Sequence, residues 1–598
     1  MVMGSSRIDA GDTGGNAPRL LALGVAALVL VCEPHIVSAA ETAESPAQMA
    51  SPPWFIDSAH PSGLQFNHFN GMTGRFYFPE MTGQGGAVLD FDGDGDLDLY
   101  LIQGSLLGTA DTLDDALFPP LPGTPLTDRL FRNDSMMDAN GSPRMIFVDV
   151  TDRAGIDAPG YGMGVAVGDI DRDGWPDIYV TNYGPNQLLR NRGNGTFEDV
   201  TATSGTGDPL WGTSATFFDY DGDHDDDLYV ANYVVFDVDE NPRCFAVSSR
   251  RDYCGPDAFA AQPDRLYRNL GEGIFEEVTS KALVGYKAGP GLGVTAADFN
   301  GDQRVDFYVA NDGRSNQLWI NRGDGTFVDE ALFSGVALNR QGRPEASMGV
   351  DAADFDGDGD EDIFLTHLMG ETNTLYINDG SGLFEDKTVQ SGMASVSLPN
   401  TSFGTAWIDI DNDGLLDLLA ANGAVRILED QAAAGDLYPL KLPNQLFRNG
   451  GGRFEEMSAA GGEVFAIPEV SRGVSLGDLD NDGDIDAVLH NNNGLTRLLM
   501  NQAGSQAGWM GLGVKRAGAA SWEIGIRFEA LAGEAGTRWR RSRADGSYCS
   551  ANDPRVVLGL GTDDSVPRLR LHRGDGEVQE FRQLPVGRFF VFFPASTT

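Results

Sequence analysis

The chain of 598 residues is poor in the residues that build common catalytic and zinc centres. Its four cysteines include no CxxC pair, and its seven histidines are scattered, so no zinc-ligand spacing is present. A phosphate-binding glycine loop is also missing. These absences remove the usual zinc-enzyme and nucleotide-binding signatures, and we therefore expect a protein that is not an enzyme.

Positive charge is scarce as well. The 42 Lys and Arg residues face 88 Asp and Glu residues, which leaves a net charge of -46. Such a surface repels nucleic acid and anionic lipid, so neither is an expected partner. The same excess destabilises a compact state through self-repulsion, which bound cations would relieve in part.

An apolar run from Leu20 to Val31 is too short to span a bilayer, and no transmembrane helix is expected in the mature chain. Arg7 and Arg19 precede this run and small residues follow it, which predicts a signal peptide over 1–40 and a linker over 41–53. A buried helix is the alternative, but the polar stretch Ala39 to Pro53 separates the run from any core. We therefore expect a secreted, periplasmic or cell-envelope protein.

The positions of the cysteines are consistent with an exported protein that contains a disulfide. Lipoprotein anchoring at Cys32 is a minor alternative, because Val31 is larger than the residue that normally precedes a lipidated cysteine. Removal of the signal leaves Cys244, Cys254 and Cys549. In an oxidising compartment we expect Cys244 and Cys254 to form a disulfide that closes a small loop, with Cys549 left as a buried thiol.

Two repeated motifs organise the chain. The pattern D-x-[DN]-x-D-x-x-x-D occurs seven times, between apolar runs that read as the two strands of a hairpin. The pattern L-x-x-N recurs in register, from Leu130–Asn133 to Leu498–Asn501, and six copies lead to an F-x-[DE] strand start. The unit is therefore four short strands, which is the pattern of a propeller blade.

The seventh unit has no fourth strand, whereas Phe55-Ile56-Asp57 stands alone ahead of the first unit. We expect this segment to complete the last blade and close the ring, which leaves no sheet edge exposed. The predicted fold is all-β, with a seven-bladed propeller over 54–507. Alternating segments over 508–598 predict a small β-sandwich-like domain.

Each acidic loop offers oxygen ligands at positions 1, 3 and 5, a backbone carbonyl at position 7 and a carboxylate at position 9, which suit one calcium ion. There is no Glu at position 12 and no flanking helix, so the loop is not an EF-hand. A single such loop could be a solvated turn, but seven in register favour metal sites, and flexible loops with five oxygens favour Ca2+ over Mg2+.

The predicted metal ligands, taken loop by loop, are Asp90, Asp92, Asp94, Asp96, Asp98; Asp169, Asp171, Asp173, Trp175, Asp177; Asp219, Asp221, Asp223, Asp225, Asp227; Asp298, Asn300, Asp302, Arg304, Asp306; Asp354, Asp356, Asp358, Asp360, Asp362; Asp409, Asp411, Asp413, Leu415, Asp417; and Asp478, Asp480, Asp482, Asp484, Asp486. Glycine at position 6 supplies the sharp turn in five loops. His224 and Gln303 replace it in the loops that start at Asp219 and Asp298, so we expect weaker calcium binding there.

The repeats resemble FG-GAP or VCBS repeats, which integrin α-chain propellers share. GSYCSANDPRVVLGLG, from Gly546 to Gly561, resembles the ASPIC/UnbV signature of the cartilage acidic protein family, and NPRCF with DYCGPDAF resembles that family's third repeat. The resemblance implies a calcium-dependent propeller, an extracellular or envelope location and no established enzymatic activity.

Three repeats carry extra residues in one kind of connection. The first loop aspartate and the L-x-x-N asparagine are 22 to 24 residues apart in four repeats, but 43, 50 and 40 apart in repeats one, three and six. The extra residues lie between the second and third strands, within Gln103–Asp128, Asn232–Asp264 and Asn422–Asn444. These loops should crowd the face opposite the calcium loops, and we expect adhesion or binding of an extracellular or envelope protein or glycan there, around Phe245 and Tyr253.

Three further questions stay open from the sequence. A polysaccharide-acting lyase or hydrolase would need only two well-placed carboxylates, and His68 is a candidate helper. From residue 511 onward the chain contains 13 Lys and Arg and 10 Asp and Glu residues. The C-terminal domain is therefore either attracted to the acidic propeller or independent of it on a short linker. Its arginine cluster either binds an anionic partner or forms a solvated edge; the members are Arg538, Arg540, Arg541 and Arg543.

Overall fold

The computed structural model describes residues 52–137, 143–532 and 536–594, which belong to one compact unit, Pro52–Thr598. The predicted signal peptide and Cys32 lie outside the described residues. Among the helices that are described, none is long and apolar enough to cross a membrane.

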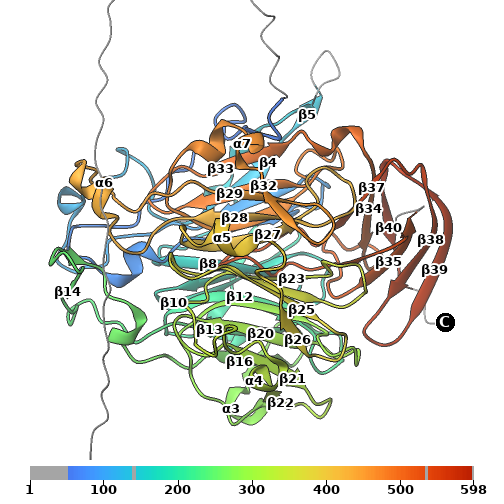
Figure 1. Ribbon diagram of the computed structural model, residues 1–598, viewed down its shortest axis with the longest axis horizontal. Coiled ribbons are helices and arrows are strands. Elements are labelled where there is room, and N and C mark those ends of the chain that lie inside the picture. The colour runs from blue at the N-terminus through green and yellow to red at the C-terminus, as the bar shows by residue number, and fades with distance from the viewer. Residues whose placement is uncertain (1–51, 138–142, 533–535, 595–598) are drawn as a thin grey trace, which may run out of the picture. The chain divides into compact units, whose positions relative to one another are not determined.

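The protein is mostly β, and seven of its sheets share one antiparallel pattern of four strands (Figure 1). The first three are β2 (Gly86–Leu89), β3 (Asp98–Leu101), β4 (Arg129–Asn133), β7 (Phe147–Asp149); β8 (Gly162–Gly168), β9 (Asp177–Asn182), β10 (Gly184–Asn191), β11 (Phe197–Asp199); and β12 (Gly212–Phe218), β13 (Asp227–Asn232), β16 (Arg265–Asn269), β17 (Phe275–Glu277). The next three are β19 (Gly291–Ala297), β20 (Asp306–Asn311), β21 (Gln317–Asn321), β22 (Phe327–Asp329), with β18 (Leu283–Val284) added in parallel; β23 (Val350–Ala353), β24 (Asp362–Leu365), β25 (Thr374–Asn378), β26 (Phe384–Asp386); and β27 (Ser402–Ile408), β28 (Asp417–Asn422), β29 (Gln445–Asn449), β30 (Phe454–Glu456).

The seventh sheet joins the two ends of this region. It contains β31 (Ser471–Gly477), β32 (Asp486–Asn491), β33 (Arg497–Asn501) and, at its edge, β1 (Phe55–Asp57). Phe55 pairs with Asn501 and Asp57 with Leu499 in antiparallel register. The predicted completion of the last sheet by the N-terminal segment is therefore confirmed.

Consecutive sheets pack face to face. Their first strands contact one another in chain order, from β2 through β8, β12, β19, β23 and β27 to β31, and β31 contacts β2 again. One apolar cluster fills each space between neighbours; Ala87, Tyr100, Val165 and Ile178, for example, lie in the cluster between the first and second sheets. The first strands are buried over nearly their whole length, which explains their runs of Gly, Ala and Val. This is the arrangement of propeller blades.

The C-terminal residues form two further sheets, drawn in red in Figure 1, around a core that includes Met510, Phe528 and Leu569. One contains β37 (Val556–Gly561), β34 (Gly508–Val514) and β40 (Arg588–Phe592), and the other β36 (Gly536–Arg541), β35 (Arg527–Ala532), β38 (Ser565–His572) and β39 (Val578–Pro585). We call this part the C-terminal β domain.

The remaining elements are short. Two small hairpins are β5–β6 (Met136–Met137 and Pro143–Arg144) and β14–β15 (Cys244–Phe245 and Arg251–Asp252). The α-helices are α1 (Thr151–Ala154), α2 (Thr201–Ser204), α3 (Thr279–Ala282), α4 (Ala331–Ser334), α5 (Met393–Ser397), α6 (Glu429–Ala433) and α7 (Ser458–Gly461), and the 3-10 helices are η1 (Phe78–Met81), η2 (Leu113–Asp115), η3 (Pro256–Ala258), η4 (Glu463–Ala466) and η5 (Gly504–Gln506).

Candidate metal centres

Each acidic segment forms the hairpin loop between the first and second strands of its sheet, as predicted. In all seven loops the carboxylate at position 1 accepts a hydrogen bond from the backbone N–H of position 6, for example Asp354 from Gly359 at 3.1 Å. Position 6 has positive φ throughout, including 72° at His224 and 69° at Gln303. The turn therefore needs a residue in the left-handed conformation at position 6. Glycine adopts this conformation without strain, whereas histidine and glutamine do not.

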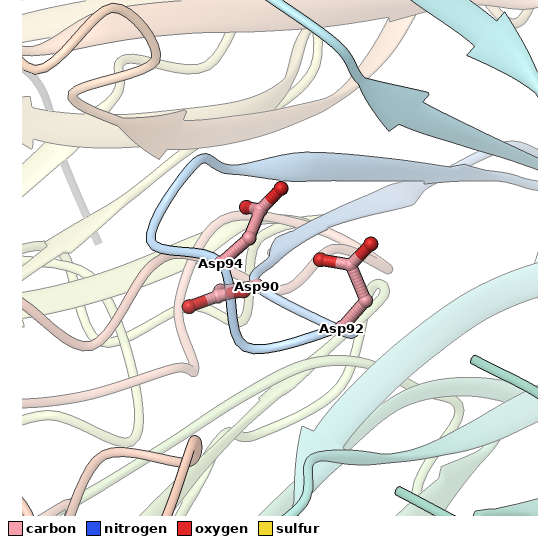
Figure 2. Close-up of side chains that lie close together, drawn as sticks. All are labelled: Asp90, Asp92 and Asp94. Atoms are coloured by element: carbon pink, nitrogen blue, oxygen red, sulfur yellow. The ribbon is translucent and has the colours of Figure 1, made fainter. Parts of the chain in front are cut away.

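At least five of the described loops bring three carboxylates together, with ligand atoms within 4.8 Å of one another. Figure 2 shows the first of these groups on the loop between β2 and β3. The groups are Asp90, Asp92, Asp94; Asp169, Asp171, Asp177; Asp219, Asp221, Asp227; Asp354, Asp356, Asp362; and Asp409, Asp411, Asp417. Positions 1, 3 and 9 therefore come together in four of these loops, and positions 1, 3 and 5 come together in the first.

Several carboxylate oxygens of the acidic loops are buried and lack a hydrogen-bond partner. They include Oδ1 of Asp92, Asp169, Asp221, Asp409, Asp411 and Asp480. A buried, unpaired carboxylate oxygen costs free energy, whereas a hard cation satisfies several of them at once. The side chains present therefore fit calcium.

Burial also makes the loop carboxylates hard to ionise on their own. It raises the pKa of Asp354 and Asp409 to about 7 and that of Asp478 to about 8. At position 9, burial raises the pKa of Asp417 to about 8 and of Asp362 to about 9. A divalent cation among such groups favours their charged forms, so ion binding and ionisation support each other.

The aspartate at position 9 has a second role that the sequence analysis missed. Asp177 accepts a hydrogen bond from the Ile170 N–H at 2.9 Å and another from the Asn191 N–H at 2.7 Å. The equivalent pair of bonds occurs in all seven repeats. Position 9 therefore ties the acidic loop to the L-x-x-N motif, and the recurrence of that asparagine was the available signal.

The C-terminal β domain packs on the face that carries these loops. Arg516 forms an ion pair with Asp169, and Arg540 donates to the Gly414 carbonyl at 3.0 Å. Arg541 pairs with Glu361 at 3.3 Å, and Arg543 pairs with Asp351. For Arg541 and Arg543, both expectations for the arginine cluster were therefore wrong. These two side chains neither form a solvated edge nor face an outside partner, because they are largely buried and pair with carboxylates of the sheets.

The three long connections meet at the opposite ends of the strands. Arg426 donates to the Tyr253 carbonyl at 2.7 Å, and the Phe118 and Tyr438 rings lie 5.6 Å apart between centroids. Cys244 and Cys254 form the expected disulfide, and Cys549 is a buried free thiol. Phe245 is 59% exposed, but Tyr253 is only 3% exposed. Of the two residues named for the expected binding region, only Phe245 is therefore accessible, since the Tyr253 hydroxyl donates to the buried Glu80 carboxylate.

Comparison with known families matches both parts of the chain. The FG-GAP-like repeat family matches residues 169–230, 254–309, 298–365 and 354–420, and the ASPIC and UnbV family matches residues 524–597. The chain therefore contains FG-GAP-like repeats and a C-terminal ASPIC and UnbV domain. The FG-GAP-repeat protein is distantly homologous to cartilage acidic protein 1: it is 27% identical to the Homo sapiens protein over 322 residues, and 26% identical to the Mus musculus protein over 321 residues. Each match covers 52% of this chain and 45% or 46% of the relative, so the chain spans less than half the length of the relatives it matches.

Two solved structures overlap with this chain at low sequence identity and low TM-score. A lectin of Agrocybe aegerita that recognises non-reducing terminal N-acetylglucosamine is 16% identical, covers 62% of this chain and 77% of its own, and has a TM-score of 0.32. Trypanosoma rangeli sialidase in complex with the inhibitor DANA is 10% identical, covers 70% and 54%, and has a TM-score of 0.30. At these TM-scores, neither likeness carries an argument about this chain.

Proposed function

We propose that this FG-GAP-repeat protein is an exported, seven-bladed, calcium-loaded propeller that binds an extracellular or envelope protein or glycan through its three long connections. The observation that carries the proposal is the meeting of these connections, one of them stapled by the Cys244–Cys254 disulfide, on the face away from the acidic loops. Figure 1 places β14 and α6 on one side of the sheets and β34 to β40 on the other. The face with the long connections is thus the one that the C-terminal β domain leaves uncovered.

These connections also expose apolar side chains, which we call the apolar tips. Val247 is fully exposed, and Leu121 and Leu437 are 74% and 78% exposed. The full set is Leu113, Leu117, Leu121, Val235, Phe245, Val247 and Leu437. Apolar side chains gathered on long loops of a rigid scaffold are the usual basis of recognition.

Calcium has a structural role in this proposal. The carboxylates at positions 1, 3, 5 and 9 would hold the ion, which would supply positive charge to buried oxygens and stiffen each hairpin. We propose up to seven sites, with the loops that start at Asp219 and Asp298 the weakest because His224 and Gln303 adopt positive φ.

The proposal includes no enzymatic activity. His68, the candidate helper of a lyase or hydrolase, is 1% exposed, and burial lowers its pKa to about 3. Burial lowers the pKa of His367 and His490 to about 3 in the same way. None of the three can exchange protons efficiently near neutral pH, which argues against acid–base catalysis by these groups.

The test compares two double variants of the mature protein on a glycan array and on immobilised matrix and envelope proteins in calcium buffer. Phe245→Asp with Val247→Asp changes the apolar tips, and Leu332→Asp with Phe333→Asp changes two side chains of α4 that are 77% exposed. The first pair should abolish binding and the second should not, with melting temperatures unchanged in both. Equal binding by the two variants would rule out the apolar tips, and turnover of a glycan would contradict the non-enzymatic role.

A further inference from the structure

The residue just before the L-x-x-N asparagine carries a positive charge in only some of the repeats. It is arginine in repeats one, two, three and six and an apolar residue in the other three: Arg132, Arg190, Arg268, Arg448, Ile320, Ile377 and Met500. The asparagine beside it is tied by its backbone to position 9 of the acidic loop in the same sheet, as Asn191 is to Asp177. The side chain at this position therefore stands close to a candidate metal loop.

Each of the four arginines lies against the position-3 aspartate of its own loop. The four pairs are Arg132–Asp92 at 3.9 Å, Arg190–Asp171 at 3.6 Å, Arg268–Asp221 at 2.7 Å and Arg448–Asp411 at 2.6 Å. Arg448 also donates to Asp413, at position 5, at 2.9 Å. A guanidinium therefore contacts a predicted calcium ligand in four of the seven loops.

These arginines engage one oxygen of the carboxylate and leave the other one facing the loop. In every pair the nearest arginine nitrogen lies against Oδ2 of the position-3 aspartate. Among the described residues, Oδ1 of Asp92, Asp221 and Asp411 is buried and has no hydrogen-bond partner. A carboxylate can bind a metal ion through one oxygen and accept from arginine through the other. The guanidinium therefore offsets the charge of a ligand that stays available to a metal ion.

A fifth loop has an arginine from another position. Arg304, at position 7, pairs with Asp302 at position 5. In the loops that start at Asp354 and Asp478, no described Lys or Arg nitrogen lies within 4.0 Å of a carboxylate at position 1, 3, 5 or 9. Arg555 reaches the last of these loops only at the Asp478 backbone carbonyl, at 3.2 Å. The seven loops thus form two classes, five with an arginine on a ligand carboxylate and two without.

An arginine in this place acts on calcium binding in two opposing ways. At about 6 Å from a divalent ion, one positive charge weakens binding about tenfold at the dielectric constant of water, and more in a half-buried loop. Holding one carboxylate in its bound orientation restores about threefold. The charge effect is the larger, so the arginine lowers the calcium affinity of its loop. It also stabilises the calcium-free loop, in which four or five carboxylates otherwise repel one another.

We propose that these arginines are built-in counter-ions that set the calcium affinity of each loop. The loops that start at Asp354 and Asp478 bind calcium most tightly and need it to keep their form, whereas the other five keep their form without calcium and bind it more weakly. The inference rests on the calcium loading of the proposed function. It gives the protein a graded response, in which two ions stay bound at low free calcium and the remaining loops fill as the concentration rises.

Three variants of the full mature chain test the counter-ions. Arg448→Met removes the arginine of the sixth loop and supplies the residue that the seventh repeat carries. Ile377→Arg adds an arginine to the fifth loop, where Glu385 lies opposite on the neighbouring strand as Glu455 lies opposite Arg448. Arg453→Met is the matched control, because it removes the same charge from an exposed residue of the sixth repeat.

Competition with a calcium-chelating dye counts the tightly bound ions in each protein. The wild type and Arg453→Met should hold two ions in the tight class, Arg448→Met three and Ile377→Arg one, with a change of about tenfold in affinity at the altered loop. Equal counts in all four proteins would overturn the counter-ion role and leave calcium loading in place. No calcium binding by the wild type would overturn the proposed calcium loading together with this inference.

Melting temperatures give a second measurement that does not depend on resolving the sites. Arg448→Met should melt at a lower temperature than Arg453→Met in excess chelator, because the acidic loop has lost its counter-ion. The rise in melting temperature on adding calcium should be larger for Arg448→Met than for the wild type. A rise that is equal or smaller for Arg448→Met would show that the arginine does not take the place of calcium in the empty loop.

Discussion

The side-chain amide of Asn191 donates a hydrogen bond of 2.8 Å to the carbonyl oxygen of Phe91, which lies 100 residues earlier, in the acidic loop of the preceding sheet. The matching bond from the L-x-x-N asparagine to position 2 of the preceding loop occurs in six of the seven repeats. Because the Asn191 N–H also bonds to Asp177, one residue joins a candidate metal loop to the next sheet.

Replacing Asn191 should therefore weaken the packing of two sheets. Asn191→Ala leaves the buried Phe91 carbonyl without this donor, and we expect a loss of about 1 to 3 kcal/mol in unfolding free energy. Asn194→Ala changes an exposed asparagine of the same repeat and should cost no more than about 0.5 kcal/mol. Denaturant melts of both variants measure the difference, and similar losses would show that the tie is not stabilising.

Removal of calcium should lower the stability of the whole protein. With a Kd of about 0.1 mM and free calcium of about 1 mM, each filled loop adds about 1.4 kcal/mol to the unfolding free energy, and seven loops add roughly 10. Calorimetry with and without excess chelator should show a large fall in melting temperature. Asp354→Ala should reduce that fall, whereas Asp152→Ala, whose side chain is 95% exposed, should not. An unchanged melting temperature in chelator would refute calcium loading.

Exchanging the residue at position 6 should change the calcium affinity and the stability of individual acidic loops. His224→Gly and Gln303→Gly each relieve a non-glycine residue at positive φ, and we expect each to raise the unfolding free energy by about 1 kcal/mol and to tighten calcium binding. The reverse change, Gly95→Gln, meets no atom within 4 Å and so isolates the backbone cost at φ +96°. Calcium titrations by calorimetry should move in opposite directions for the two kinds of variant; a shift in the same direction would exclude backbone strain as the cause.

Buried histidines should make the protein sensitive to acid. Burial lowers the pKa of His490 to about 3, whereas an unfolded histidine titrates near 6.5. The unfolded state therefore binds more protons between these values, so the stabilisation is present above about pH 6.5 and is lost as the pH falls toward 3. Within this range the wild type should lose about 1.4 kcal/mol per pH unit more than His490→Gln. Denaturant melts at each pH measure the unfolding free energy of the two proteins. If the two free energies change in parallel with pH, the lowered pKa of His490 is contradicted.

Much of the fold is predictable because its signals are local and repeated. The acidic hairpins, the L-x-x-N strands and the F-x-[DE] starts recur in register, and a missing strand at one end matched a spare strand, Phe55–Asp57, at the other. The Cys244–Cys254 disulfide was also predictable, since two cysteines ten residues apart in one loop have few other partners.

The repeat pattern by itself thus determined the four-strand units, the closing strand and the candidate metal ligands, because each depends on residues close in sequence or repeated at a fixed offset. Only the tertiary structure decided that Arg541 and Arg543 face carboxylates of the sheets, that Tyr253 is buried beneath the long connections, and that residues 545–553 hydrogen-bond to the first strands of several sheets. Most of these contacts join segments more than 150 residues apart, and many end on backbone carbonyl or N–H groups, which every residue carries and no side-chain pattern marks.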